Sequence, residues 1–386
     1  MNEEKLPQIR LKGALQSSHP WILWKHVEKA SERIHSGSVV DIVDPKGQWV
    51  GRGFYNGHAR IRLRLLTAKP EIIDKSFFAK RIEKAIMWRR KTLQLDKVTN
   101  AYRVVASEGD ELTGLVIDRF DSCLVLEFFA AGMYRFRPVI EEILESHFPG
   151  AQFYSFAERH VQKQESFNCQ RSNEPAPVII KENGVAFRVA PCQKYKTGFF
   201  IDQRENRLAF SELCQGKRVL DLCCNSGGFS LYASLRGKAQ AVTGVDLDEE
   251  VLTMAKENAT LNGVALHFVC ANLFDWLKAH SEKYDVVVLD PSKQTRSTEK
   301  IDEALKNYLS MNELAMRAVT PGGILLTCSC SGLIREEQFL DVIAQAAHNV
   351  HRTCQVFRIT GAAADHPYLV DVPQGRYLKA VWGVLS

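Results

Sequence analysis

The sequence predicts an α/β protein whose largest part, residues 184–386, forms a doubly wound sheet of seven strands. Three observations predict this fold. Short apolar runs alternate with helical patterns over this part of the chain, residues 218–236 read as a strand, a glycine turn and a helix, and acidic residues stand where strands end. A small β-rich domain at 1–72 and a central α+β domain at 73–183 are expected before it, because 386 residues exceed one ordinary core.

The first domain is predicted from short alternating runs at 39–43, 49–54 and 59–66, each bounded by turn residues. A strand at 60–65 would place Arg60, Arg62 and Arg64 on one face, which we interpret as a phosphate-tracking face. Residues 1–100 hold 20 Lys and Arg against 10 Asp and Glu, whereas the remainder holds 30 against 35. This concentrated positive charge indicates a polyanionic partner.

The central domain begins with an amphipathic helix pattern at 75–95. Its apolar stripe is expected to pack in the core, and its basic face, Arg89 included, to extend the nucleic-acid surface. Strands at 115–117, 123–129 and 152–156 and a helix at 138–147 follow, and nothing in them requires more than a scaffold.

The composition excludes several classes of protein. A hydrophobic content of 45% and a charged content of 25% are typical of soluble globular proteins, and neither a membrane-spanning run nor a signal-peptide core is present, so a cytoplasmic location is expected. The ten cysteines contain no C-x-x-C pair, which argues against a zinc ribbon and against a disulfide scaffold; no metal site is expected.

The stretch 218–236 predicts a cofactor site. Its strand carries Asp221, and Gly227 and Gly228 in the following turn let the backbone approach a ligand at a helix start. The dinucleotide fingerprint G-x-G-x-x-G is absent, which counts against a nicotinamide oxidoreductase. Asp246 ends the next strand, where a carboxylate would bind ribose hydroxyls. This order of acid, double glycine and acid is typical of S-adenosylmethionine-dependent methyltransferases.

Three further segments should lie at the same edge of the sheet. Residues 195–207 are interpreted as a lid with Gln203 and Arg204 as polar contacts. Asn272 follows the third strand, where it would contact an adenine edge or simply cap a helix. Asp290 begins an Asp-Pro-Ser-Lys turn that would present a carboxylate to a planar base, and Pro291 stiffens this turn.

The segment Cys328-Ser329-Cys330-Ser331-Gly332 ends the next predicted strand. A thiolate here could attack carbon 6 of cytosine, which makes carbon 5 nucleophilic enough to accept a methyl group. Such a cysteine needs a pKa below its usual value of about 8.5. Alternation along a strand places Cys328 and Cys330 on one side, so the pattern does not choose between them, and two inert buried cysteines are the alternative.

Several of these motifs together resemble the large-subunit (23S) rRNA cytosine-5 methyltransferase I family over nearly the whole chain. The motifs are H-P-W at 19–21, D-I-V-D at 41–44, S-E-G-D-E-L-T-G-L-V-I-D-R-F at 107–120, K-T-G-F-F-I-D-Q-R-E-N-R at 196–207, C-S-C-S-G at 328–332 and A-A-A-D-H-P at 362–367. The resemblance implies a PUA-like barrel that binds structured RNA, a Rossmann-like methyltransferase domain, S-adenosyl-L-methionine as cofactor and large-subunit rRNA as substrate.

The resemblance also assigns residues. Cys330 would be the nucleophile, with Asp290 and Lys196 as further catalytic residues. The cofactor contacts would be Asp221, Cys223, Asn225, Gly227, Asp246, Leu247, Asn272, Leu273, Asp290, Gln203 and Arg204.

This chain departs from the family at Ser292, where the family usually has a second proline, and at Cys224, Asn225 and Ser226 of the glycine turn. These departures leave the target base open, with a guanine methyltransferase of the same fold or a non-catalytic rRNA-binding assembly factor as alternatives. The modified nucleotide, naked RNA or a ribosomal particle as substrate, and the oligomeric state, a homodimer included, also stay open.

Overall fold

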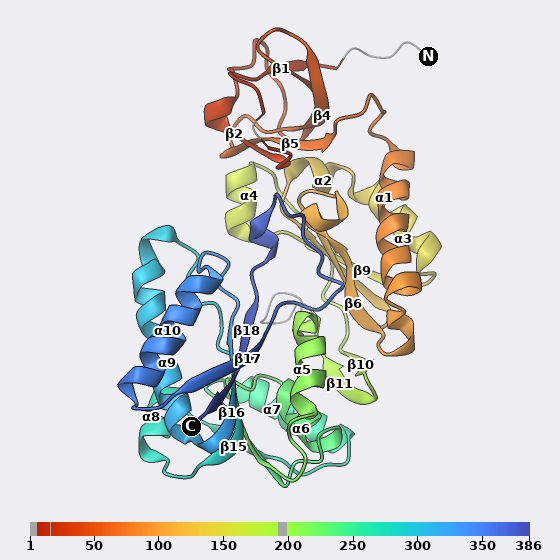
Figure 1. The fold of residues 1–386 in the computed structure, drawn as a ribbon. Coiled ribbons are helices and arrows are strands. Elements are labelled where there is room, and N and C mark those ends of the chain that lie inside the picture. The colour runs from red at the N-terminus through yellow and green to blue at the C-terminus, as the bar shows by residue number, and fades with distance from the viewer. Residues whose placement is uncertain (1–5, 16, 192–198) are drawn as a thin grey trace. The chain divides into compact units, whose positions relative to one another are not determined.

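The computed structural model describes residues 6–15, 17–191 and 199–386 (Figure 1). Lys196 and Tyr195 of the predicted lid lie outside the described residues. The chain divides into two compact units: unit 1 comprises Met1–Val178, Val189–Gly198 and Ala364–Gly375, and unit 2 comprises Ile179–Arg188, Phe199–Ala363 and Arg376–Ser386. Among the described helices, none combines the length and the apolar composition needed to cross a membrane. The boundaries 1–72, 73–183 and 184–386 stay a prediction.

Unit 1 begins with a five-stranded sheet of order β1-β3-β4-β5-β2. Its strands are β1 (Gln8–Arg10), β2 (Trp21–Leu23), β3 (Ser38–Val43), β4 (Trp49–Tyr55) and β5 (Ile61–Thr67). Gly53 allows β4 to approach β5, because a Cβ at this position would lie 2.2 Å from the Arg64 carbonyl oxygen. Ile9, Val40, Ile42 and Leu63 form the core of this sheet.

The expected arginine face on β5 is wrong for Arg64. Arg60 is exposed, but Arg64 is only 6% exposed and donates to Glu165 Oε1 at 2.9 Å, with Glu108 at 3.8 Å. Two carboxylates from later in the chain therefore neutralise this guanidinium, and it cannot track phosphates.

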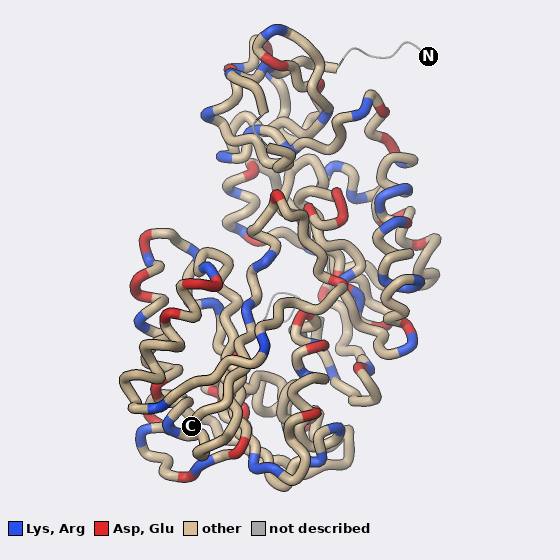
Figure 2. Tube along the Cα trace, viewed as in Figure 1, with Lys and Arg blue, Asp and Glu red and all other residues tan. Residues whose placement is uncertain are grey.

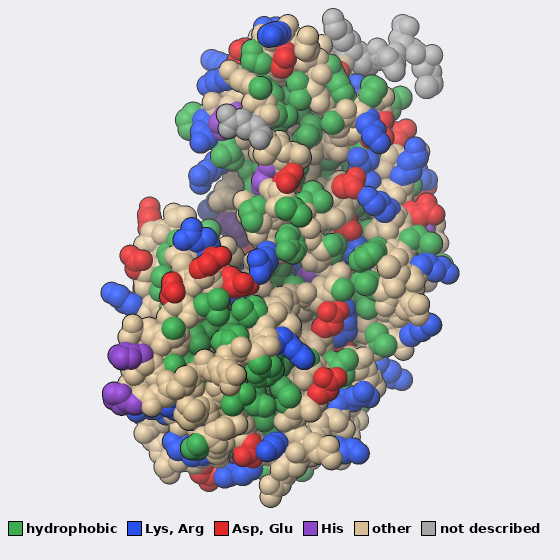
Figure 3. All heavy atoms as spheres, viewed as in Figure 1, with side chains coloured by type: hydrophobic (Ala, Val, Ile, Leu, Met, Phe, Trp, Pro, Cys, Tyr) green, Lys and Arg blue, Asp and Glu red, His purple; other side chains and the backbone are tan. Residues whose placement is uncertain are grey.

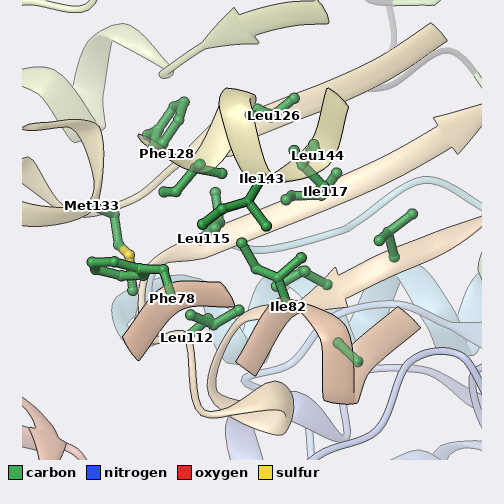
Figure 4. Packing of buried hydrophobic residues seen from close by; sticks show 14 of the residues in the cluster. Phe78, Ile82, Leu112, Leu115, Ile117, Leu126, Phe128, Met133, Ile143 and Leu144 are labelled. Carbon is green, nitrogen blue, oxygen red and sulfur yellow. The ribbon is translucent and has the colours of Figure 1, made fainter. Parts of the chain in front are cut away.

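The second sheet of unit 1 has the order β6-β7-β8-β9. Its strands are β6 (Ala101–Ala106), β7 (Leu115–Phe120), β8 (Cys123–Phe128) and β9 (Gln152–Phe156), and the helices of this part are α1 (Lys75–Met87), α2 (Ala131–Arg135), α3 (Arg137–His147) and α4 (Arg159–Glu165). Figure 4 shows Phe78 and Ile82 of α1 in one apolar cluster with Leu115 and Ile117 of β7 and Ile143 of α3. This core holds the second sheet and the helices α1 and α3 together.

The helix predicted at 75–95 is shorter than expected. α1 ends at Met87, and a π-helical turn covers Trp88–Thr92. Arg89 in this turn is fully buried, binds both carboxylate oxygens of Asp110 at 2.6 and 2.8 Å, and donates to the carbonyl of Arg103. The placement of Arg89 on a basic outer face was therefore wrong, because its charge is satisfied inside the protein.

Unit 2 contains the predicted seven-stranded sheet, in the order β14-β13-β12-β15-β16-β18-β17. Its strands are β12 (Arg218–Leu222), β13 (Ala241–Asp246), β14 (His267–Cys270), β15 (Tyr284–Leu289), β16 (Val319–Ser329), β17 (Cys354–Thr360) and β18 (Lys379–Leu385). The first five strands run parallel, and β18 pairs antiparallel with both β16 and β17. The strand order reverses between β12 and β15, which is where ligands bind in open α/β sheets.

Helices cover both faces of this sheet. Those on one face are α8 (Leu273–Ala279), α9 (Ile301–Ala318) and α10 (Glu336–Asn349), which pack on a cluster that includes Leu220 and Val287. On the other face, Phe210 of α5 (Arg204–Ser211) and Phe229 of α6 (Gly228–Leu235) pack with Val219. The alternation of Val219 and Leu220 between the two clusters follows from the strand period of two. The remaining elements are α7 (Glu249–Leu261) and the hairpin of β10 (Val178–Glu182) and β11 (Val185–Val189).

Candidate active site

The glycine turn after β12 has an unusual backbone. Cys223, Asn225 and Gly227 all adopt positive φ, at 61°, 48° and 84°. Left-handed conformations are uncommon for non-glycine residues and cluster at functional sites. The Asn225 N–H donates to Asp246 Oδ2 at 2.9 Å, so the turn closes on the end of the neighbouring strand.

Asp221, in β12, hydrogen-bonds the first turn of α6. Its Oδ2 accepts from the N–H of Ser230 at 2.9 Å and from the Ser230 hydroxyl at 2.7 Å, while its buried Oδ1 has no hydrogen-bond partner among the described residues. Burial raises the pKa of the Asp221 carboxyl to about 7. Asp221 thus holds the first turn of α6 against the end of β12 from inside the protein.

The ends of β13 and β14 lie side by side. The N–H of Ala271 donates to the carbonyl of Asp246 at 2.9 Å, which brings the predicted contacts Asp246 and Asn272 to one edge. Leu247 is 66% exposed directly after β13, and Leu273 begins α8. Asn272 accepts from the Phe274 N–H at 2.9 Å, so it caps α8, the alternative that the sequence had left open.

Asp290 follows β15 at the point where the strand order reverses. Its N–H donates to the carbonyl of Leu222 at 3.2 Å, and its Oδ2 accepts from Gln203 Nε2 at 3.0 Å. Burial, and then the charge of Asp202, raises the pKa of the Asp290 carboxyl to about 7. Gln203 of the predicted lid therefore reaches this strand end, and Arg204 beside it is 2% exposed.

The two cysteines of the C-S-C-S-G segment occupy different environments. Cys328 is fully buried within β16, in an apolar cluster with Val288, Ala380 and Trp382. Cys330 stands one residue beyond the end of β16, is partly buried, and has its Sγ 3.9 Å from the carbonyl of Pro291. The alternation along the strand predicted the same side for both cysteines. The structure distinguishes them, because β16 ends between them at Ser329.

The lowered pKa that a nucleophilic cysteine needs is not found for Cys330 in the protein without RNA or cofactor. Burial raises the pKa of the Cys330 thiol to about 11, and the charges of Asp290 and Asp202 act in the same direction, whereas Lys293 opposes them. The thiol is therefore protonated at neutral pH, and any reaction through its thiolate must first remove a proton.

Lys379, which the sequence reading did not single out, supports the turn that follows Cys330. Its buried ammonium donates to the carbonyls of Ser331 at 2.8 Å, Ile334 at 2.9 Å and Tyr377 at 2.9 Å. Burial lowers the pKa of Lys379 to about 8. A lysine at the start of the apolar run 378–384 was the signal that could have identified it.

Asp202 and Tyr377 were also missed. The Tyr377 hydroxyl donates to Asp202 Oδ2 at 2.6 Å. Because residues 202 and 377 are far apart in the sequence, no spacing indicates this pair.

Comparisons with known proteins extend these observations. Residues 136–380 match a family of S-adenosylmethionine-dependent methyltransferases, and residues 10–68 match a PUA-like domain. The protein called ribosomal RNA large subunit methyltransferase I in Photobacterium profundum is 37% identical over 95% of both chains, and that of Klebsiella pneumoniae (strain 342) is 35% identical over 98% of both.

Two solved structures share the fold at lower identity. SMU.776, a methyltransferase by its description and in complex with SAH, aligns with a TM-score of 0.78 and 21% identity over 91% of this chain and 92% of its own. A Streptococcus mutans protein described as SAM-dependent aligns with a TM-score of 0.79 and 19% identity over 98% of this chain and all of its own. The seven-stranded sheet thus belongs to a methyltransferase fold.

Proposed function

Because the chain belongs to the ribosomal RNA large subunit methyltransferase I family of S-adenosylmethionine-dependent enzymes, we propose that it methylates carbon 5 of a cytosine in large-subunit rRNA. The observation that carries the choice of carbon 5 is the position of Cys330, outside its strand and beside the Asp290-Pro291 turn. A buried structural cysteine would resemble Cys328 instead.

The residues at the edge of unit 2 fit the cofactor. Asp246 supplies a carboxylate at the end of the second strand, where ribose hydroxyls can donate to it. The turn at 223–227 places three residues of positive φ next to the end of β13, and Leu247 offers an exposed apolar side chain next to Asp246. When bound, S-adenosylmethionine supplies an electrophilic methyl group.

The protein's own groups can then activate the base. Cys330 gives its proton to water and its sulfur forms a bond to carbon 6, while the electron pair of the double bond between carbons 5 and 6 shifts toward N3 and the carbon 2 carbonyl. Asp290, whose pKa is raised to about 7, is partly protonated near neutral pH and can donate a hydrogen bond to that developing charge. Carbon 5 becomes nucleophilic and accepts the methyl group.

An exposed basic and aromatic surface of unit 1 supports RNA as the partner. Trp24 is 55% exposed in a short turn whose other residues, Lys25 and His26, are also exposed. Backbone hydrogen bonds join this turn to Arg60 at 3.0 Å and Lys12 at 2.9 Å, both of them exposed. Figure 2 shows Lys and Arg spread along this part of the chain, and Figure 3 shows basic and hydrophobic side chains interspersed along the margin of the N-terminal sheet. Unpaired bases stack on such indole rings while cations bind phosphates.

The experiment is nucleoside mass spectrometry of unmodified large-subunit rRNA after incubation with S-adenosylmethionine. Wild type should form 5-methylcytosine, Cys330→Ala should form none, and Cys328→Ala should retain activity because Cys328 lies in the core. Cofactor affinity of Cys330→Ala should stay near that of wild type. A methylated guanine that is insensitive to both cysteine changes would refute the covalent mechanism.

A further inference from the structure

We propose that Asp202 is the general base that removes the carbon 5 proton and so releases the methylated RNA; this rests on the proposed cytosine-5 chemistry. After methyl transfer, carbon 5 carries both a methyl group and a hydrogen, and carbon 6 is bonded to Cys330. Asp202 takes the proton, the electron pair of the C–H bond restores the double bond between carbons 5 and 6, and Cys330 leaves as a thiolate. Without this base the enzyme stays bonded to its product.

The second cysteine cannot perform this step. Cys328 has no exposed surface and packs among Val288, Ala380 and Trp382, so no ring proton can reach its sulfur. Asp290 already accepts from Gln203, and the proposed chemistry uses it to hydrogen-bond the charge that develops on the ring. The release step therefore needs another acceptor near Cys330.

Asp202 is held in a fixed position with one oxygen unused. It lies in the short 3-10 turn Ile201–Gln203, and its carbonyl accepts from the Ala363 N–H at 2.8 Å. Oδ2 accepts from the Tyr377 hydroxyl at 2.6 Å, whereas the buried Oδ1 has no hydrogen-bond partner among the described residues. A buried unsatisfied carboxylate oxygen is costly, which favours a catalytic reason for it.

Tyr377 places this carboxylate beside the Cys330 turn. A Cβ added at Gly332 would lie 3.4 Å from Tyr377 Cβ, so the tyrosine packs directly against the turn. Lys379 donates to the carbonyls of both Tyr377 and Ser331, at 2.9 and 2.8 Å, which joins the two segments.

Electrostatics agree with this placement. The negative charge of Asp202 contributes to raising the pKa of Cys330 and that of Asp290, so its carboxylate lies near both groups. On the other side, Gln203, the next residue along the chain, hydrogen-bonds Asp290. Asp202 thus lies near both strand ends at which the target base would be held.

The test is a search for trapped enzyme on RNA. Asp202→Asn, which keeps the size of the side chain, should bond to RNA, transfer the methyl group and stop, giving a protein–RNA species that survives a denaturing gel. Multiple turnover should fall by about 100-fold or more, the usual contribution of a general base. Tritium release from RNA labelled at carbon 5 of cytosine should fall with it. Asp202→Ser, which also lacks the carboxylate, provides a second variant.

Matched controls keep the inference separate from the proposed function. Glu212→Gln, an exposed carboxylate change at the end of α5, should turn over and release tritium as wild type does. RNA containing 5-fluorocytosine cannot lose fluorine as a cation, so it should trap wild type and Asp202→Asn alike, but not Cys330→Ala. If 5-fluorocytosine traps no enzyme, the covalent function itself is refuted. If it traps wild type while both Asp202 variants release product normally, or lose turnover without trapped RNA, Asp202 is not the base.

Discussion

The ion pair of Arg207 and Glu182 offers a sharp test of how unit 2 holds residues 199–207, the described part of the predicted lid. Arg207 Nε and Nη2 bind the two carboxylate oxygens of Glu182 at 2.8 and 2.9 Å, and the two side chains are 3% and 0% exposed. Arg207 also donates to the carbonyl of Phe200 at 2.9 Å and lies 4.6 Å from the ring centroid of Phe199. The pair therefore joins Phe199 and Phe200 to the β10–β11 hairpin.

Removal of one partner should lower the free energy of unfolding much more than removal of both partners. Arg207→Met leaves the Glu182 carboxylate buried without its partner, which costs about 3–5 kcal/mol in comparable pairs. Adding Glu182→Gln removes the orphaned charge, so the double variant should recover about 2 kcal/mol of that free energy of unfolding. Arg207→Lys should not substitute for arginine, because an ammonium cannot bind both oxygens and the Phe200 carbonyl.

The assay is urea denaturation followed by hydrogen exchange of peptides from β12 to β16, which reports unit 2 separately from unit 1. The control is Arg188→Met, which breaks a pair with Glu257 at 3.7 Å whose side chains are 57% and 54% exposed. That change should cost no more than about 1 kcal/mol. The reasoning is refuted if Arg207→Met costs as little as the control, or if the cost of the double variant equals the sum of the two single costs.

Three other predictions concern RNA binding, stability and thiol reactivity. Trp24→Ala should weaken RNA binding by about 1–3 kcal/mol, the range for one stacked base, whereas Ile72→Ala at a site 60% exposed should not; equal binding by both variants in a filter assay would exclude the Trp24 surface. Asp221 has a raised pKa in the fold, so its contribution to stability is complete below about pH 4 and is lost as the pH rises through about 7. Asp221→Asn should therefore gain stability relative to wild type between pH 4 and 8, by up to about 4 kcal/mol in denaturation curves, and a difference that does not vary with pH would contradict this. Cys330, with its pKa near 11, should react with iodoacetamide at pH 7 roughly 100-fold more slowly than an ordinary thiol, as mass spectrometry of its peptide can show, and labelling at the rate of a free thiol would count against the raised pKa.

The sequence by itself determined the architecture of unit 2. The strand predicted to end at Asp246 is β13, and the strand, turn and helix predicted at 218–236 appear as β12 and α6. Apolar periodicity and turn residues are local signals, so they can be read without knowing the fold. The same signals placed Asp246 at the end of one strand and Asp290 and Cys330 directly after two others, where parallel strands bring side chains to one edge.

Only the tertiary structure decided which charges are free and which groups meet. The sequence pattern predicts that Arg64 and Arg89 are exposed. Both are buried, because Glu165 and Asp110, which lie later in the chain, pair with them inside the protein. Asp202 hydrogen-bonds Tyr377, which lies 175 positions later in the sequence. Helix and strand periodicities cannot predict a contact over such a separation. The pKa of Cys330 follows from burial and from carboxylates on two other segments, and these exist only once the chain has folded.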